Sequence, residues 1–177
     1  MNALMILVKG PKVNVITQSY YDSVVNMLDC SVVRCPSCEH TGTIIHGYYT
    51  RKLKTVYGVI SLRIMRVKCS TCGKTHAVLL CSIVPYSMIL LEETIDIISA
   101  DNTADYNQIM ESNIHIDLSD IYRVRRNYRL FWKERVKSFG IEITDPQISA
   151  KCISIFQRQF MQIPCTLCAL HMRTHII

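Results

Sequence analysis

The sequence predicts an α+β fold in which antiparallel strands come first and helices follow. Two Cys-x-x-Cys pairs enclose segments whose apolar residues alternate, which is typical of a β-hairpin. From residue 88 onward, apolar residues recur every three or four positions, as they do in amphipathic helices. Of the 177 residues, 49% are hydrophobic and 19% are charged, which is enough apolar material for a folded core.

The N-terminal segment, residues 1–33, predicts two short strands and one helix. Strands are expected at residues 3–8 and 13–17, with a turn at Gly10-Pro11 between them. A helix is expected over residues 19–28, because apolar residues recur there at helical spacing. We expect this segment to contribute packing and no chemistry.

Four of the nine cysteines, Cys35, Cys38, Cys69 and Cys72, predict a structural zinc site. A two-residue gap lets a tight turn direct both thiolates of a pair at one ion, and two pairs complete the four-sulfur tetrahedron that Zn²⁺ prefers. Four thiolates leave no open coordination position, so the expected role of the metal is structural. The alternatives are a redox dithiol or two unrelated buried pairs.

Residues 34–87 therefore predict a small zinc ribbon made of antiparallel β structure. Strands are expected at residues 43–53, 59–68 and 76–80, and residues 55–58 join the first two. Such a hairpin has little apolar surface of its own, so the metal would supply about 10 kcal/mol or more of folding free energy. Five nearby residues are alternative ligands: Cys30, Cys81, His40, His46 and His76.

Residues 141–177 predict one further helix, followed by a second group of metal-binding residue types. The helix is expected to begin at Asp145 and to end near Gln162. The group after it consists of Cys165, Cys168, His171 and His175. The gap between Cys168 and His171 is much shorter than the loop of a zinc finger, which favours a frayed tail over a second metal site.

Residues 88–140 predict a helix-turn-helix-like unit. Helices are expected over residues 88–100, 104–111 and 119–139, and Ser119 is the expected N-cap of the last one. Two helices followed by a basic third helix is the order found in helix-turn-helix units, where the last helix enters the major groove.

The last of these helices predicts one packed face and one cationic face. The packed face contains Ile121, Val124, Tyr128, Phe131, Trp132 and Phe139, and the cationic face contains Arg123, Arg126, Arg129, Lys133 and Lys137. Residues 119–139 contain seven bases and two acids, which favours contact with nucleic acid over an ordinary solvated helix.

These basic residues have expected roles in binding duplex DNA. Arg123 and Arg126 are expected to read bases, because they lie near the start of the helix, and Arg129 and Lys133 are expected to contact phosphates. Three ribbon residues are expected to add backbone contacts: Arg51, Lys52 and Lys54.

The charge distribution also predicts an anionic partner, since the formal net charge is +6. Residues 35–87 (seven bases, one acid) and residues 119–139 are basic, and the seven acids of residues 88–118 separate them. This acidic segment has no scaffold for a two-metal nuclease site, and the sequence contains no Gly-x-Ser-x-Gly elbow or phosphate-binding loop. We therefore expect no enzymatic activity.

The sequence contains no run of 18 or more apolar residues and no signal-peptide pattern. These observations predict a cytoplasmic protein with no membrane partner, in which cysteines are reduced.

The ribbon motifs resemble those of a known family. They are Cys35-Pro-Ser-Cys38, then His46-Gly47-Tyr48-Tyr49-Thr50-Arg51, and then Arg66-Val67-Lys68-Cys69-Ser-Thr-Cys72-Gly-Lys-Thr-His76. Residues 34–87 resemble the N-terminal zinc ribbon of bacterial insertion-sequence transposases. The whole chain resembles short bacterial zinc-ribbon and helix-turn-helix proteins that are described only as a domain of unknown function.

The resemblance implies DNA binding through helix-turn-helix segments after the ribbon, without strand transfer, because the chain has no room for a nuclease domain. We therefore expect a zinc-dependent DNA-binding protein that is a transposase-related accessory protein or a transcriptional regulator. One alternative is an interaction module that binds a transposase, a polymerase subunit or a second copy of the chain. Another alternative is RNA binding through Tyr48, Tyr49 and Arg51.

Overall fold

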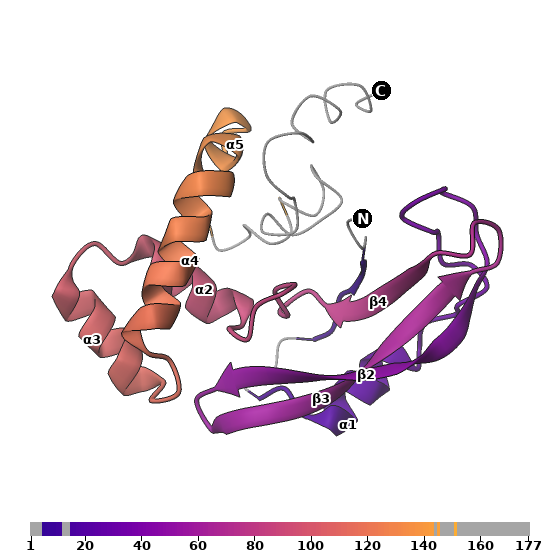
Figure 1. Cartoon of the computed structure of the whole chain (residues 1–177), viewed down its shortest axis with the longest axis horizontal. Helices are drawn as coiled ribbons and strands as arrows, with labels where there is room; N and C mark the ends of the chain where they lie inside the picture. The colour runs from indigo at the N-terminus through magenta and orange to yellow at the C-terminus, as the bar shows by residue number, and fades with distance from the viewer. Residues whose placement is uncertain (1–4, 12–14, 144, 146–150, 152–177) are drawn as a thin grey trace. The chain divides into compact units, whose positions relative to one another are not determined.

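A computed structural model of the chain describes residues 5–11, 15–143, 145 and 151 (Figure 1). Within these residues the protein is α+β, with one four-stranded sheet and five helices. The chain divides into two compact units between Ile83 and Val84. The first unit contains the sheet and one helix, and the second contains four helices.

The sheet consists of strands β1 (Ile6–Val8), β2 (Thr43–Thr55), β3 (Gly58–Cys69) and β4 (Thr75–Leu80) in the order β1-β4-β3-β2. β1 is parallel to β4, and the other two pairings are antiparallel. The strands expected at residues 43–53, 59–68 and 76–80 are confirmed to within two residues at each end.

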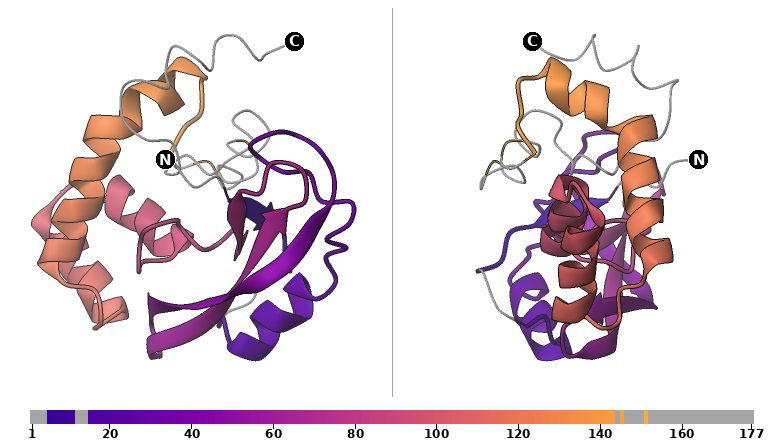
Figure 2. Two further views of the ribbon diagram at one scale, coloured as in Figure 1. Left: turned by 45° about the vertical axis from the view of Figure 1, so that its right-hand side comes forward. Right: turned by 90° about the vertical axis from the view of Figure 1, so that its left-hand side faces the viewer.

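Strands β2 and β3 form a long twisted hairpin, which Figure 2 shows from two further sides. Its turn is short because Thr55 pairs directly with Gly58, whose φ of +139° suits glycine. Along β3, Leu62 and Ile64 are buried while the residues between and before them are exposed, which is the alternation that a half-buried strand requires.

Helix α1 (Gln18–Val25) lies beside the part of β3 that no longer pairs with β4. The pairing of β3 with β4 stops at Arg66 and Ala77, so the backbone groups of the next residues need other partners. The Tyr21 hydroxyl accepts a hydrogen bond from the Met65 N–H at 2.9 Å and donates one to the Val78 carbonyl at 2.8 Å. Side chains of α1 thus replace part of a missing strand.

The expected strand at residues 13–17 is wrong for its described part, because residues 15–17 are not in a strand. Thr17 is instead the N-cap of α1, and its side chain accepts a hydrogen bond from the Tyr20 N–H. The helix expected over residues 19–28 is present but ends at Val25.

Replacing Tyr21 by phenylalanine is expected to destabilise the first unit by about 1–3 kcal/mol, because the Met65 N–H and the Val78 carbonyl would lose their partner in a buried place. Burial raises the pKa of Tyr21 to about 12, so the hydroxyl keeps its proton at neutral pH. Chemical denaturation measures the change, and Tyr57→Phe at the exposed hairpin turn is the control. Equal stability of Tyr21→Phe and wild type would show that the bridge contributes nothing.

The second unit consists of α2 (Leu91–Ser99), α3 (Thr103–Ser112), α4 (Leu118–Phe131) and α5 (Lys133–Ser138). The three helices expected after residue 88 are present, with two corrections to the last. Its N-cap is Asp117 and not Ser119, because Asp117 and Asp120 form a reciprocal capping box. It is also interrupted at Trp132, whose φ of −124° and ψ of −36° lie outside the helical region.

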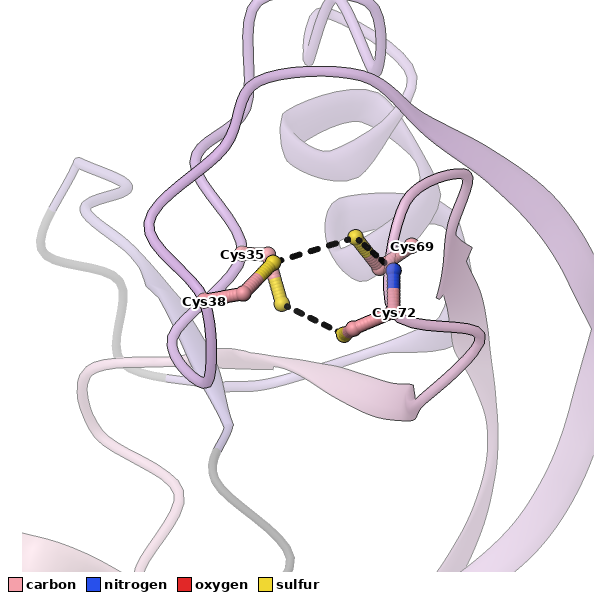
Figure 3. A group of neighbouring side chains, drawn as sticks. All are labelled: Cys35, Cys38, Cys69 and Cys72. Carbon is pink, nitrogen blue, oxygen red and sulfur yellow. Dashed lines mark hydrogen bonds between the residues drawn. The ribbon is translucent and has the colours of Figure 1, made fainter.

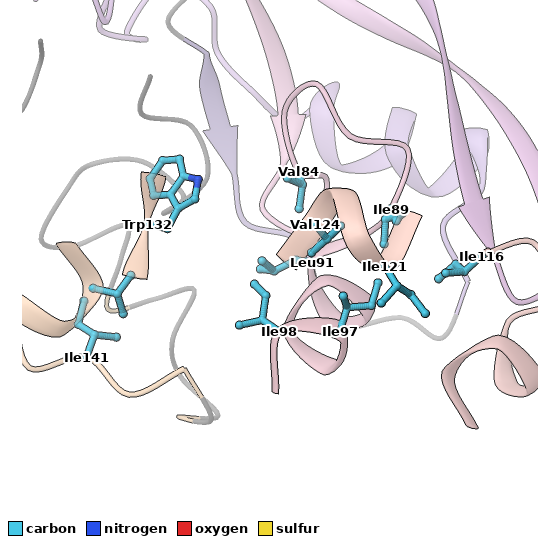
Figure 4. Close-up of a cluster of buried hydrophobic side chains, with 11 residues drawn as sticks. Val84, Ile89, Leu91, Ile97, Ile98, Ile116, Ile121, Val124, Trp132 and Ile141 are labelled. Atoms are coloured by element: carbon cyan, nitrogen blue, oxygen red, sulfur yellow. The ribbon is translucent and has the colours of Figure 1, made fainter. Parts of the chain in front are cut away.

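The core of the second unit joins α2, α4 and α5 (Figure 4). The largest fully buried side chains in it are Ile89, Ile97 and Ile121. Trp132 and Val136 are buried, whereas Phe139 is 42% exposed. The expectation that Phe139 packs on the same face is therefore wrong.

No described helix has the length and the apolar composition needed to cross a bilayer. The helix expected to run from Asp145 to Gln162 falls almost entirely outside the described residues, as do Cys165, Cys168, His171 and His175.

Candidate functional site

The four cysteines predicted as ligands come together at one end of the hairpin (Figure 3). Cys35 and Cys38 lie in the loop before β2, Cys69 ends β3, and Cys72 lies in the turn before β4. The sulfurs of Cys35 and Cys72 are 3.6 Å apart, as are those of Cys38 and Cys69, and all four lie within 4.8 Å of one another. None is in a disulfide, whose sulfurs are about 2.05 Å apart. The four thiols are arranged to hold a metal ion.

The two cysteine pairs lie in two separate backbone turns that have the same pattern of hydrogen bonds. In the first turn, the Glu39 N–H donates to the Cys35 carbonyl at 2.8 Å, and the Cys35 N–H donates to the carbonyl five residues later at 2.9 Å. In the second turn, the Gly73 N–H and the Cys69 carbonyl make the equivalent bond at 3.1 Å, and the Cys69 N–H again bonds five residues ahead at 2.9 Å. The fifth residue of each turn is left-handed, with φ of 63° at Glu39 and 69° at Gly73.

Backbone N–H groups in these turns donate hydrogen bonds to two of the sulfurs. The Cys72 N–H donates to Cys69 Sγ at 3.5 Å, and the Ser37 N–H donates to Cys35 Sγ at 3.4 Å. The hydrogen bond from Cys72, with a further one from Thr71 and those from neighbouring thiols, lowers the pKa of Cys69 to about 6 against the opposing effect of desolvation.

Four thiolates at these distances would repel one another, because their charges have the same sign. A hydrogen bond from the His40 N–H lowers the pKa of Cys38, but desolvation and the three other thiols outweigh it and raise this pKa to about 12. A bound metal cation removes this conflict, since it makes four thiolates compatible.

Of the alternative ligands, His76 places its ring against a sulfur of the cluster. Its ring is buried, and Nε2 lies 3.3 Å from Cys35 Sγ, which places it beside the four sulfurs as a hydrogen-bond partner. In the sequence, only its closeness to the second cysteine turn suggested His76 as a ligand. His76 lies on β4 and pairs with Val67 of β3, which brings it to the cysteine end of the sheet. The other alternative ligands do not join the cluster: Cys30, Cys81, His40 and His46.

Helices α4 and α5 present the predicted basic side chains to solvent. Ile121, Val124 and Trp132 are buried. The exposed residues are Arg123, Arg126, Arg129, Lys133 and Lys137. Arg123 forms an ion pair with buried Asp120 while its side chain stays 56% exposed. No ion pair joins any of the other four to the residues that the structure describes.

Arg125 has a structural role that the sequence did not indicate. Its Nη1 donates to the carbonyls of Ile97, at 3.1 Å, and Ala100, at the C-terminal end of α2. Its guanidinium also lies over the ring of Tyr106 in α3, 5.4 Å from the centroid. One side chain therefore joins three helices, and it stabilises the negative end of the α2 dipole.

The three predicted ribbon bases do not share a face of the hairpin. Arg51 pairs with buried Leu62, whereas Lys52 pairs with exposed Ser61. Lys54 pairs with exposed Val59 and so shares the face of Lys52.

Comparison with known proteins gives one family match. Residues 35–116 match a family described as Domain of unknown function (DUF6431). The match includes the four cysteines, the hairpin, α2 and α3, and it ends before α4. No curated protein and no solved structure matches the chain significantly, and the comparisons show no link to the transposase ribbons that the cysteine motifs resemble.

Proposed function

We propose that the protein is a zinc-dependent DNA-binding protein in which α4 contacts duplex DNA. The observation that carries the proposal is the exposed basic surface of α4 and of the first residue of α5, where Arg126, Arg129 and Lys133 make no ion pair with the described residues. Basic side chains that no ion pair neutralises remain available to attract a polyanion.

The geometry of the four sulfurs supports Zn²⁺ as the metal. A tetrahedron with Zn–S bonds of about 2.3 Å has edges of about 3.8 Å. The two contacts of 3.6 Å are close to that value. Thiolate-only sites are typical of structural zinc, so we assign the metal a role in folding and the protein no catalytic role.

The arrangement of helices supports a helix-turn-helix-like reading of the second unit. α2 and α4 share the core through Ile97, Ile98, Ile121 and Val124, so they pack by their apolar faces. The opposite face of α4 remains exposed, and a helix of this kind fits the major groove of B-DNA. Such a protein would accompany a mobile element or regulate transcription.

The contacts that the basic side chains make within the protein refine their proposed roles in DNA binding. Arg126, which is exposed on α4, is the first candidate for base reading, and Arg123 is the second because Asp120 already holds part of its guanidinium. Arg129, which is exposed near the end of α4, and Lys133, which is exposed at the start of α5, are proposed to contact phosphates.

Duplex binding is tested by titrating the zinc-loaded protein with labelled genomic fragments over a series of salt concentrations. For Arg129→Ala with Lys133→Ala, we expect weaker binding to every fragment and a log–log salt slope that is smaller by about 1.8, or about 0.9 per phosphate contact. For Arg126→Ala, we expect a cost of about 1–3 kcal/mol that is confined to preferred fragments.

The matched control is Lys9→Ala with Lys74→Ala, which removes the same charge from exposed positions of the first unit. If the control lowers the affinity and the slope as much as the α4 variant does, binding depends on net charge alone. In that case α4 is a solvated surface, and the interaction-module alternative gains support.

A further inference from the structure

The exposed face of the β2–β3 hairpin combines aromatic, basic and hydroxyl side chains. From β2 it carries Tyr48, Thr50 and Lys52, and from β3 it carries Ser61 and Arg63. Thr50 pairs with Arg63 and Lys52 pairs with Ser61, so these side chains emerge on one side of the sheet. We call these five residues the hairpin face.

The two strands that carry the hairpin face supply no negative charge, and the neighbouring helix α1 contributes Asp22, which accepts a hydrogen bond from Gln18 Nε2 at 2.8 Å. The sequence contains no Asp or Glu between Glu39 and Glu92, and seven Lys or Arg residues lie in that interval. Every charged side chain that β2 and β3 themselves supply is therefore cationic. This sign of charge complements the backbone of a nucleic acid.

Arg63 and Tyr48 form a stack at the centre of the hairpin face. The Arg63 guanidinium lies 4.2 Å from the centroid of the Tyr48 ring, and Tyr48 remains 43% exposed. A planar guanidinium on an aromatic ring presents a flat surface on which a base can stack.

The backbone that carries Arg63 is held on both sides. The Arg63 N–H donates to Gln18 Oε1 at 2.7 Å, and Gln18 Nε2 donates to the Arg63 carbonyl at 3.2 Å. Gln18 thus occupies the place of a neighbouring strand, and the stack is anchored before any ligand arrives. Preorganisation of this kind lowers the entropic cost of binding.

We propose that the hairpin face binds single-stranded nucleic acid, with a base stacked on the Arg63–Tyr48 pair and Lys52 contacting the phosphate backbone. The stack requires a single strand, because bases within a duplex do not expose their faces. This site lies in the first unit and does not depend on the duplex binding proposed for α4.

The test measures binding of the zinc-loaded full chain to two fluorescein-labelled oligonucleotides, one of thymidine and one of uridine. Tyr48→Ala and Arg63→Ala are each expected to weaken binding about 5- to 150-fold, the loss typical of one stacked base. Tyr48→Phe keeps the ring and is expected to bind as wild type does. Lys52→Ala is expected to reduce the log–log salt slope by about 0.7. The two oligonucleotides distinguish DNA from RNA as the source of the strand.

Lys74→Ala is the matched control, because it removes one exposed base outside β2 and β3. Zinc content and circular dichroism establish that each variant is folded. The proposal is wrong if wild type binds neither oligonucleotide, or if folded Tyr48→Ala and Lys52→Ala both bind as tightly as Lys74→Ala.

The α4 variants keep this test separate from that of the proposed function. Arg129→Ala with Lys133→Ala is expected to lose duplex binding and to retain the single strand. A hairpin variant that loses duplex binding while its single-strand binding is unchanged would contradict the stacking role of Tyr48 and Arg63.

Discussion

Cys69→Ser is expected to lose the bound zinc and, with it, the folded structure of the first unit. Structural zinc contributes about 10–16 kcal/mol in small zinc-dependent domains, which is as large as the whole stability of a typical domain of about 5–15 kcal/mol. Cys69 is buried, and its sulfur lies 3.6 Å from that of Cys38, so a serine cannot substitute without leaving three thiolates around the ion. Metal analysis and circular dichroism of the purified chain measure the two losses.

Cys81→Ser is the control for this experiment, because Cys81 is half-buried just after β4 and lies outside the four-sulfur cluster. We expect it to retain one zinc per chain and a normal spectrum. Wild-type protein that is free of metal and gives the same spectrum as the zinc-loaded protein would refute a folding role for the metal.

Arg125→Ala is expected to destabilise the second unit by about 1.5–3 kcal/mol, the range for hydrogen bonds to a charged group. The substitution leaves the carbonyls of Ile97 and Ala100 without the guanidinium and removes its contact with Tyr106. Arg125→Lys keeps the charge but not the planar fork, so it should recover only part of the loss. Helical circular dichroism during urea titration measures the change.

Arg126→Ala provides the comparison, since Arg126 is exposed on the next position of α4. A surface substitution of this kind changes stability by less than about 0.5 kcal/mol. If the two alanine variants unfold at the same urea concentration, Arg125 does not hold α2 and α3 to α4.

The sequence predicted the features that depend on short-range spacing. The Cys-x-x-Cys pairs located the candidate metal site, and the alternation of apolar residues located β2, β3 and β4. The start of α4 was predictable in the same way, although we expected Ser119 as the cap. The pair Asp117 and Asp120 has the spacing of a capping box, and Ser119 has no such partner three residues later.

Features that depend on distant contacts were not predictable from local patterns. The helix breaks at Trp132 although no proline or glycine occurs there, so no local signal in the sequence marks the break. Arg125 bonds to a carbonyl 28 residues away, and Tyr21 bonds to backbone groups 44 and 57 residues away. Nothing in the adjacent sequence distinguishes these side chains from exposed neighbours.

The position of β2 at the border of the sheet has a consequence for self-association. Among the residues that the structure describes, the thirteen residues of β2 have a strand on one side only, and a sheet edge of this length invites pairing with another chain. Lys52 and Lys54 and the irregularity between Ile45 and Gly47 oppose such pairing by repulsion and by bending the edge. Ile44 and Ile45, which are 59% and 53% exposed, form the part of β2 that charge does not protect. Aggregation would therefore start at the cysteine end of β2, and more readily once salt screens the lysines.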